Sequence, residues 1–277
     1  MANTPQVARR RPAAGTAGAA RQPAGRTKAD RLHVTALARG LQILRCFSHE
    51  RPELSPQEIV RMTGLPQPTV WRLCHTLSTE GFLICPGDGT RMSLGLPALA
   101  LGYSALVRQA LPKVALPYME QFTARHRMGM SLGIRDGLDM LYLQRTHGDF
   151  VYLNDPVGAR RPFATAPTGW ACYAAYGEDE RKAVRKSLRQ RDPSGWTKTE
   201  TQLAGADEDF RRHCCVLSLG AMHAQMNAIA VPIRSLKSDK VYALSASGLA
   251  TVWPRKKLLA VGTEIIALAR DLAVAAD

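Results

Sequence analysis

Apolar residues recur at helical spacing from residue 35 onward. Leu37, Leu41, Leu44 and Phe47 follow one another at intervals of four and three, so they fall on one face of a helix. An amphipathic helix is therefore predicted near the start of the folded part of the chain, which we expect to begin at about residue 31.

The next segment carries the signals of a second helix start. Ser55 can serve as the N-cap, Pro56 then occupies the first helical position, and Glu58 completes a Ser-x-x-Glu capping box. A Thr-Gly-Leu-Pro sequence at 63–66 ends this helix, because glycine can adopt the left-handed conformation and proline cannot continue a helix.

A third helix is predicted from Gln67 or Pro68 to about Glu80, with an apolar stripe that includes Val70 and Cys74. Residues 82–85 and 91–94 are predicted to form two strands, joined by the turn-forming sequence Pro-Gly-Asp-Gly. Two helices joined by a tight turn and followed by such a hairpin are typical of a winged helix-turn-helix that binds DNA.

The polar face of the third helix would enter the major groove. There arginine can pair with guanine and glutamine with adenine, whereas Arg39 and the wing residue Arg91 are better placed for phosphates. We predict DNA contacts by Arg39, Ser55, Gln67, Pro68, Thr69, Arg72 and Arg91.

The second half alternates between strand pairs and helices. Strands are predicted at 130–134, 138–144, 227–233 and 240–247, and helices at 97–109, 112–126, 168–176, 178–189 and 254–274. This pattern predicts an α+β domain with an antiparallel sheet that can cup a small ligand. The final helix is apolar enough to be core or a subunit contact.

The net charge of the chain adds little to the prediction of DNA binding. The 277 residues carry a formal net charge of +14, of which +6 lies in residues 1–28, +1 in 29–95 and +7 in 96–277. Residues 1–30 read as a disordered basic arm, although a transit peptide would have similar composition. The prediction of DNA binding therefore depends on the positions of the cations and not on their total.

Other classes of site are weakly supported. No apolar run is long enough to span a membrane, and the cysteines form no Cys-x-x-Cys pair, which favours a reduced, cytoplasmic setting. Cys214 and Cys215 read as two small buried residues, with a redox pair as the alternative. The histidines lack metal-ligand spacing and no phosphate-binding glycine loop occurs, so we expect no metal or cofactor.

An enzyme is the main alternative, because residues 129–133 match the Gly-x-Ser-x-Gly pattern of serine hydrolases. That pattern requires a strand, a sharp turn and then a helix, whereas here a second strand follows. Ser131 is therefore expected within a hairpin, and a serine hydrolase remains the less favoured hypothesis. A DNA-binding protein whose second domain only dimerises is a further alternative.

The chain closely resembles the IclR family of bacterial transcription regulators from about residue 35 to 272. The motifs that carry the resemblance are Ala-Arg-Gly-Leu-Gln-Ile-Leu at 38–44, Thr-Gly-Leu-Pro-Gln-Pro-Thr-Val-Trp-Arg-Leu at 63–73, Arg-Met-Ser-Leu-Gly at 91–95, Gly-Ala-Arg-Arg-Pro-Phe-Ala-Thr-Ala-Pro-Thr-Gly at 158–169, Ile-Ala-Val-Pro-Ile at 229–233 and Ala-Leu-Ser-Ala-Ser-Gly at 243–248.

The resemblance implies a ligand-controlled regulator that binds a double-stranded DNA operator as a homodimer or a dimer of dimers. It implies a GAF-like effector domain for a small carboxylic or aromatic acid of a catabolic pathway, with Thr168, Gly169, Ser245 and Ser247 lining the pocket. A helix start and hydroxyl groups also suit a carboxylate on physical grounds. The sequence departs from the family pattern at Trp170, Cys214, Cys215, Ala221 and Gln225.

We therefore expect four regions. These are a basic arm at 1–30, a winged helix-turn-helix domain at 31–95, a linker helix at 96–110 and an effector-binding domain at 111–277.

Overall fold

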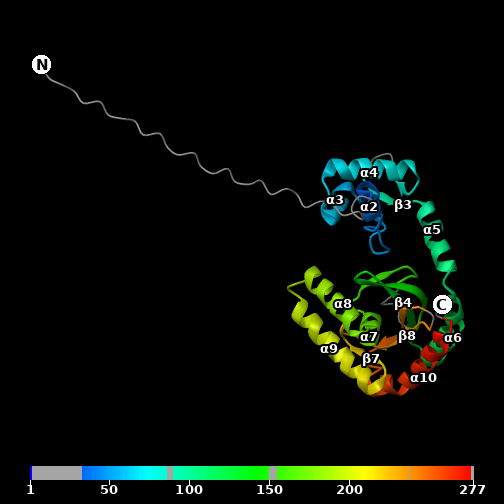
Figure 1. Cartoon of the computed structure of the whole chain (residues 1–277). Helices are drawn as coiled ribbons and strands as arrows, with labels where there is room; N and C mark the ends of the chain where they lie inside the picture. The colour runs from blue at the N-terminus through cyan, green and yellow to red at the C-terminus, as the bar shows by residue number, and fades with distance from the viewer. Residues whose placement is uncertain (2–32, 86–89, 150–154, 237, 276–277) are drawn as a thin grey trace.

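The computed structural model describes Met1 and residues 33–85, 90–149, 155–236 and 238–275. The predicted arm at 1–30 and the wing turn at 86–89 lie almost wholly outside these residues. The chain forms an N-terminal helical unit and a larger unit built around a sheet, and one helix runs between them (Figure 1).

The N-terminal unit contains three helices and a small antiparallel sheet of strand order β1-β3-β2. Its elements are α2 (Thr35–Leu44), β1 (Glu53–Leu54), α3 (Pro56–Thr63), α4 (Gln67–Thr79), β2 (Leu83–Ile84) and β3 (Met92–Leu94). The predicted capping box is present, with the Ser55 hydroxyl accepting from the Glu58 amide at 3.3 Å. Gly64 ends α3 in the left-handed conformation, with φ at 67°.

Only the later part of the predicted apolar stripe is buried, where Phe47 belongs to the core of the N-terminal unit and Leu44 packs against it. Leu37 and Leu41 are exposed, whereas Ile43 is fully buried with Ile59 and Val70 against α3 and α4. The helix is therefore where its spacing predicts, but contacts with the two following helices decide which side is covered. Strand β1, only two residues long, was not predicted.

Helix α5 (Leu96–Val107) connects the two units and leads into α6 (Ala110–His126). No residue of α5 is buried, and Leu99 and Tyr103 expose more than 60% of their surface. The predicted linker helix is thus present, with most of its apolar residues exposed and Leu106 packed against the core of the larger unit.

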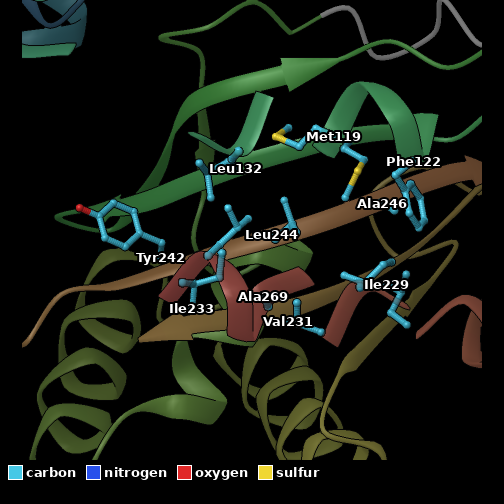
Figure 2. Close-up of a cluster of buried hydrophobic side chains, with 14 of the residues drawn as sticks. Met119, Phe122, Leu132, Ile229, Val231, Ile233, Tyr242, Leu244, Ala246 and Ala269 are labelled. Atoms are coloured by element: carbon cyan, nitrogen blue, oxygen red, sulfur yellow. The ribbon is translucent and has the colours of Figure 1, made fainter. Parts of the chain in front are cut away.

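The larger unit is built on a six-stranded antiparallel sheet of order β6-β5-β4-β9-β8-β7. Its strands are β4 (Gly129–Asp136), β5 (Asp139–Thr146), β6 (Arg160–Pro162), β7 (Val216–Leu219), β8 (Met226–Arg234) and β9 (Val241–Leu249). Helices α6 and α10 (Arg255–Ala273) cover one face, where Met119, Leu132, Leu244 and Ala269 belong to one buried cluster (Figure 2).

The opposite face of the sheet is covered by α7 (Pro167–Ala175) and α9 (Trp196–His213), with α8 (Glu178–Arg191) packed outside (Figure 1). Phe163, Trp170, Leu203 and Ala243 lie in the second buried cluster, which fills this layer. The predicted α+β class and antiparallel sheet are confirmed. Helix α9 and the short strands β6 and β7 were not predicted.

Candidate functional site

A groove between α2 and α4 has a volume of about 1170 Å³. Arg39 from α2 and Thr69 and Arg72 from α4 line it together, although the two helices lie about 30 residues apart in the chain. Trp71 and His75 line the same groove. Three of the predicted DNA contacts therefore meet on one concave, cationic surface.

The other predicted DNA contacts do not line this groove. Gln67 and Pro68 are exposed at the start of α4. Arg91 donates to the Glu53 carbonyl at 2.9 Å, and its guanidinium lies 3.6 Å from a Glu58 carboxylate oxygen. The Ser55 oxygen caps α3, which leaves its O–H able to donate.

A second, enclosed pocket lies on the α7 side of the large sheet, and strand register explains why its walls are polar. Ser131 on β4 pairs with both Arg145 on β5 and Ser245 on β9, so these side chains project from neighbouring strands. Ser247 lies two residues further along β9 on the same face. All four residues line the pocket, together with Tyr142, Asp155, Pro167, Ser218, Met222, Met226 and Ala228.

The predicted effector residues on α7 sit beside this pocket and not in its wall. Pro167 lines it, whereas Thr168 and Gly169 are buried one and two positions further along the helix. A side chain on Gly169 would place its Cβ 2.2 Å from the Phe163 carbonyl oxygen. Close packing thus accounts for this glycine.

An ion pair that was not predicted from the sequence crosses the pocket wall. Arg145 Nη1 lies 3.0 Å from Asp155 Oδ2, and both side chains are more than 90% buried. The Arg145 guanidinium also lies over the Tyr142 ring, 5.0 Å from its centroid. Arg145 directly follows the strand predicted at 138–144, and nothing in the sequence marked it or placed Asp155 next to it.

Asp155 has two further basic neighbours, Arg161 and His49. Its carboxylate accepts hydrogen bonds from Arg161, with Nε at 2.9 Å, and lies 3.4 Å from His49 Nε2. Burial alone would raise the pKa of Asp155, but Arg161, Arg145 and His49 together hold it below its usual value. The carboxylate is therefore ionised at neutral pH.

The same cluster has the residue types of a metal site, since ligand atoms of His49, Glu50 and Asp155 lie within 4.8 Å of one another. Its chemistry is different, because Arg161 already binds both Glu50 and Asp155. Guanidinium groups in these positions neutralise the carboxylates and would repel a divalent cation. We describe the cluster as an ion-pair network.

The serine of the Gly-x-Ser-x-Gly sequence does not have the geometry of a nucleophile. Ser131 lies inside β4, which continues to Asp136 and turns directly into β5. A nucleophile elbow would require a helix after the serine. The hairpin predicted for this segment is present instead.

Three of the positions that depart from the family pattern differ in their burial and contacts. Trp170 is buried and donates its indole N–H to the Ala164 carbonyl at 2.7 Å. Cys215 is buried, but Cys214 is exposed at the end of α9, so the prediction of two buried cysteines is wrong for Cys214. Both are free thiols.

No helix among the described residues is long and apolar enough to cross a bilayer.

Comparison with known proteins agrees with this arrangement. Residues 36–83 match the family described as the IclR helix-turn-helix domain, and residues 103–274 match the bacterial transcriptional regulator IclR C-terminal family. The chain is 27% identical to the HTH-type transcriptional regulator TsaQ1/TsaQ2 of Comamonas testosteroni over 80% of each chain. It is also 27% identical to the Pca regulon regulatory protein of Pseudomonas putida, over 77% of this chain and 74% of that protein.

Two solved structures extend the likeness. An IclR family regulator from Brucella abortus is 35% identical, with a TM-score of 0.82 over 92% of this chain and 97% of that one. An IclR homologue from Microbacterium hydrocarbonoxydans, solved with 4-hydroxybenzoate, is 25% identical with a TM-score of 0.65, over 86% of this chain and 99% of that one. The relatives are transcriptional regulators and not enzymes. Since the two family matches follow the helix-turn-helix and the pocket-bearing unit in order, this chain belongs to the IclR family of bacterial transcriptional regulators.

Proposed function

We propose that this regulator is controlled by a small organic acid that binds in the polar pocket on the α7 side of the sheet. The observation that carries the proposal is the buried Arg145, whose guanidinium faces a pocket also lined by Ser131, Ser245 and Ser247. A guanidinium binds a carboxylate in bidentate fashion, and hydroxyl groups add further donors. The solved relative that holds 4-hydroxybenzoate supports an aromatic acid as one candidate.

The pocket must expand to receive such a ligand. Its volume is about 30 Å³, which corresponds to roughly one water molecule. Pockets for small ligands typically measure about 300–1000 Å³. Met222 and Met226 line the pocket, and flexible methionine side chains are suited to repacking around a ligand.

We assign DNA reading to residues 31–95, connection to 96–110 and effector binding to 111–277. In this proposal Gln67, Pro68, Thr69 and Arg72 enter the major groove, while Arg39, Ser55 and Arg91 act at its edges on phosphates. The protein would act in the cytoplasm as a homodimer or a dimer of dimers. Two half-sites would then lie about 34–36 Å apart, or a multiple of that spacing.

The DNA assignment is tested by comparing Arg72→Ala with Arg39→Ala on an operator and on random DNA. If Arg72 reads a base, Arg72→Ala weakens operator binding by about 1–3 kcal/mol and leaves binding to random DNA nearly unchanged. Arg39→Ala weakens both equally, because phosphates are the same in any sequence. Equal losses on both DNAs for Arg72→Ala would assign it to phosphate as well.

The effector assignment is tested by calorimetry of the full chain against benzoate, 4-hydroxybenzoate and a set of aliphatic monocarboxylates. Arg145→Leu should abolish binding. The matched control is Arg135→Leu, which removes an arginine from the neighbouring strand β4 that contacts Glu180 and the Tyr176 ring instead of lining the pocket. If no acid binds the unaltered protein, a second unit that only dimerises becomes the better explanation.

A further inference from the structure

The buried carboxylate of Asp155 lies between the effector pocket and the DNA-binding unit. On one side it contacts Arg145 in the pocket wall, at 3.0 Å. On the other it contacts Arg161 on β6 and His49, which belongs to the segment between α2 and β1. One carboxylate is therefore contacted by side chains from both units.

Arg161 extends the contact in the same direction. Besides holding Asp155, its Nη1 donates to Glu50 Oε1 at 2.7 Å. The segment that carries His49 and Glu50 follows α2 and extends toward the sheet-containing unit (Figure 1). A continuous ionic chain thus runs from Arg145 through Asp155 and Arg161 to Glu50.

A carboxylate ligand and Asp155 would compete for the same guanidinium. Asp155 is 3% exposed and lines the pocket, so a ligand anion that reached Arg145 would lie within a few ångströms of a second negative charge. Two carboxylates at such a distance repel each other strongly in a buried site. The pocket volume of about 30 Å³ leaves no room for both groups in their present positions.

We propose that Asp155 is the element through which the effector controls the DNA-binding unit: an acid that binds Arg145 displaces Asp155, which breaks the Asp155 contact with His49 and loosens the Arg161 contact with Glu50. The proposal rests on the proposed binding of an organic acid in this pocket. Ligand binding would thereby loosen the attachment of the DNA-binding unit to the larger unit, although the ligand itself does not contact the DNA-binding unit. Such a coupling requires the acid to favour the released state over the linked one.

The link between the units is tested with two neighbouring arginines on β6. Arg161→Gln removes the contacts with Asp155 and Glu50, whereas Arg160→Gln removes contacts with Asp136 and Asp139 inside the effector unit. Amide hydrogen exchange of the segment 45–52 is measured in the full chain without ligand. Arg161→Gln should speed exchange there by about two- to fivefold, as expected for loss of a partly exposed ion pair. Equal exchange in the two variants overturns the link.

The competition is tested by benzoate titration of the full chain and of Asp155→Asn. Asparagine keeps the shape but removes the charge, so benzoate should bind the variant about tenfold or more tightly. Benzoate should also speed exchange of segment 45–52 in the unaltered protein. If Asp155→Asn is poorly folded, Glu50→Gln, on the other side of the contact, should reproduce the faster exchange.

The outcomes separate this proposal from the proposed function. Benzoate that binds both proteins equally overturns the competition but leaves acid binding in place. Failure of benzoate to bind either protein overturns the acid-binding function and the competition together. In that case the ionic link between the units is still tested by hydrogen exchange in the Arg161→Gln and Arg160→Gln variants.

Discussion

The close contact at the start of α7 leads to a sharp prediction for Gly169→Ala. The new Cβ would lie 2.2 Å from the carbonyl oxygen of Phe163 and 3.0 Å from its carbonyl carbon and Cα. Non-bonded carbon atoms are comfortable at about 3.5–4.0 Å, so α7 must move by roughly 1 Å. The obstacle is backbone and cannot rotate away.

The magnitude follows from two opposing effects. Overpacking in a buried site costs about 1–3 kcal/mol, while replacing a helical glycine by alanine contributes up to about 1 kcal/mol of stability. We expect Gly169→Ala to lower the free energy of unfolding by about 1–2 kcal/mol. Since Pro167, two residues earlier, lines the pocket proposed to bind the effector, the same shift should also weaken acid binding.

The matched control is Gly205→Ala in α9, where a Cβ would meet nothing within 4 Å. This change should raise stability by about 0.5–1 kcal/mol, because it removes backbone freedom from the unfolded chain at no steric cost. Urea denaturation followed by near-ultraviolet circular dichroism measures both variants. A Gly169→Ala protein as stable as the unaltered chain would refute the reasoning, since the contact would then be relieved without cost.

Three further predictions concern single side chains. Ser55→Ala should lower the free energy of unfolding by about 1 kcal/mol in urea denaturation, because α3 loses its N-cap. The control Ser104→Ala, on the exposed linker helix, should change the free energy of unfolding by less than about 0.5 kcal/mol. Similar losses of stability in the two variants would argue against the cap. Because the pKa of Asp155 is lowered in the folded protein, its ionised form stabilises the fold above the unfolded value of about 3.9 and loses this effect as pH falls. Asp155→Asn should therefore flatten the dependence of the urea midpoint on pH below about 4, and unchanged profiles would contradict the ion pairs. A thiol reagent should modify Cys214 well before Cys215, whose pKa burial raises to about 11; simultaneous loss of both thiols on mild oxidation would instead favour a redox pair.

Local signals in the sequence were sufficient for the helix-turn-helix. The capping box at Ser55, the left-handed Gly64 and the helix from Gln67 each depend on residues within one turn of one another, and all three are present. The same holds for the hairpin of β4 and β5, where Gly137 turns with φ at 66°. Such features need no knowledge of distant parts of the chain.

Elements with weak patterns were missed for a physical reason. Helix α9 buries only Leu203 and Ala206 fully and has no side-chain cap, so its stability comes mainly from packing against α7 and β7. Strand β6 is three residues long and polar at the sheet edge. Neither leaves a periodic signal, because tertiary contacts and not local propensity hold them in place.

By itself, the sequence determined the helix-turn-helix, the hairpin of β4 and β5 and the family to which the chain belongs. Only the tertiary structure decided that Leu37 faces outward while Ile43 is buried, that Ser131 and Ser245 flank one another, and that Arg145 meets Asp155. Helix caps and hairpin turns are determined by residues that are neighbours in the sequence. Pocket walls and ion-pair chains form where strand register and loop packing bring together residues that are distant in the sequence, and no local pattern records those meetings.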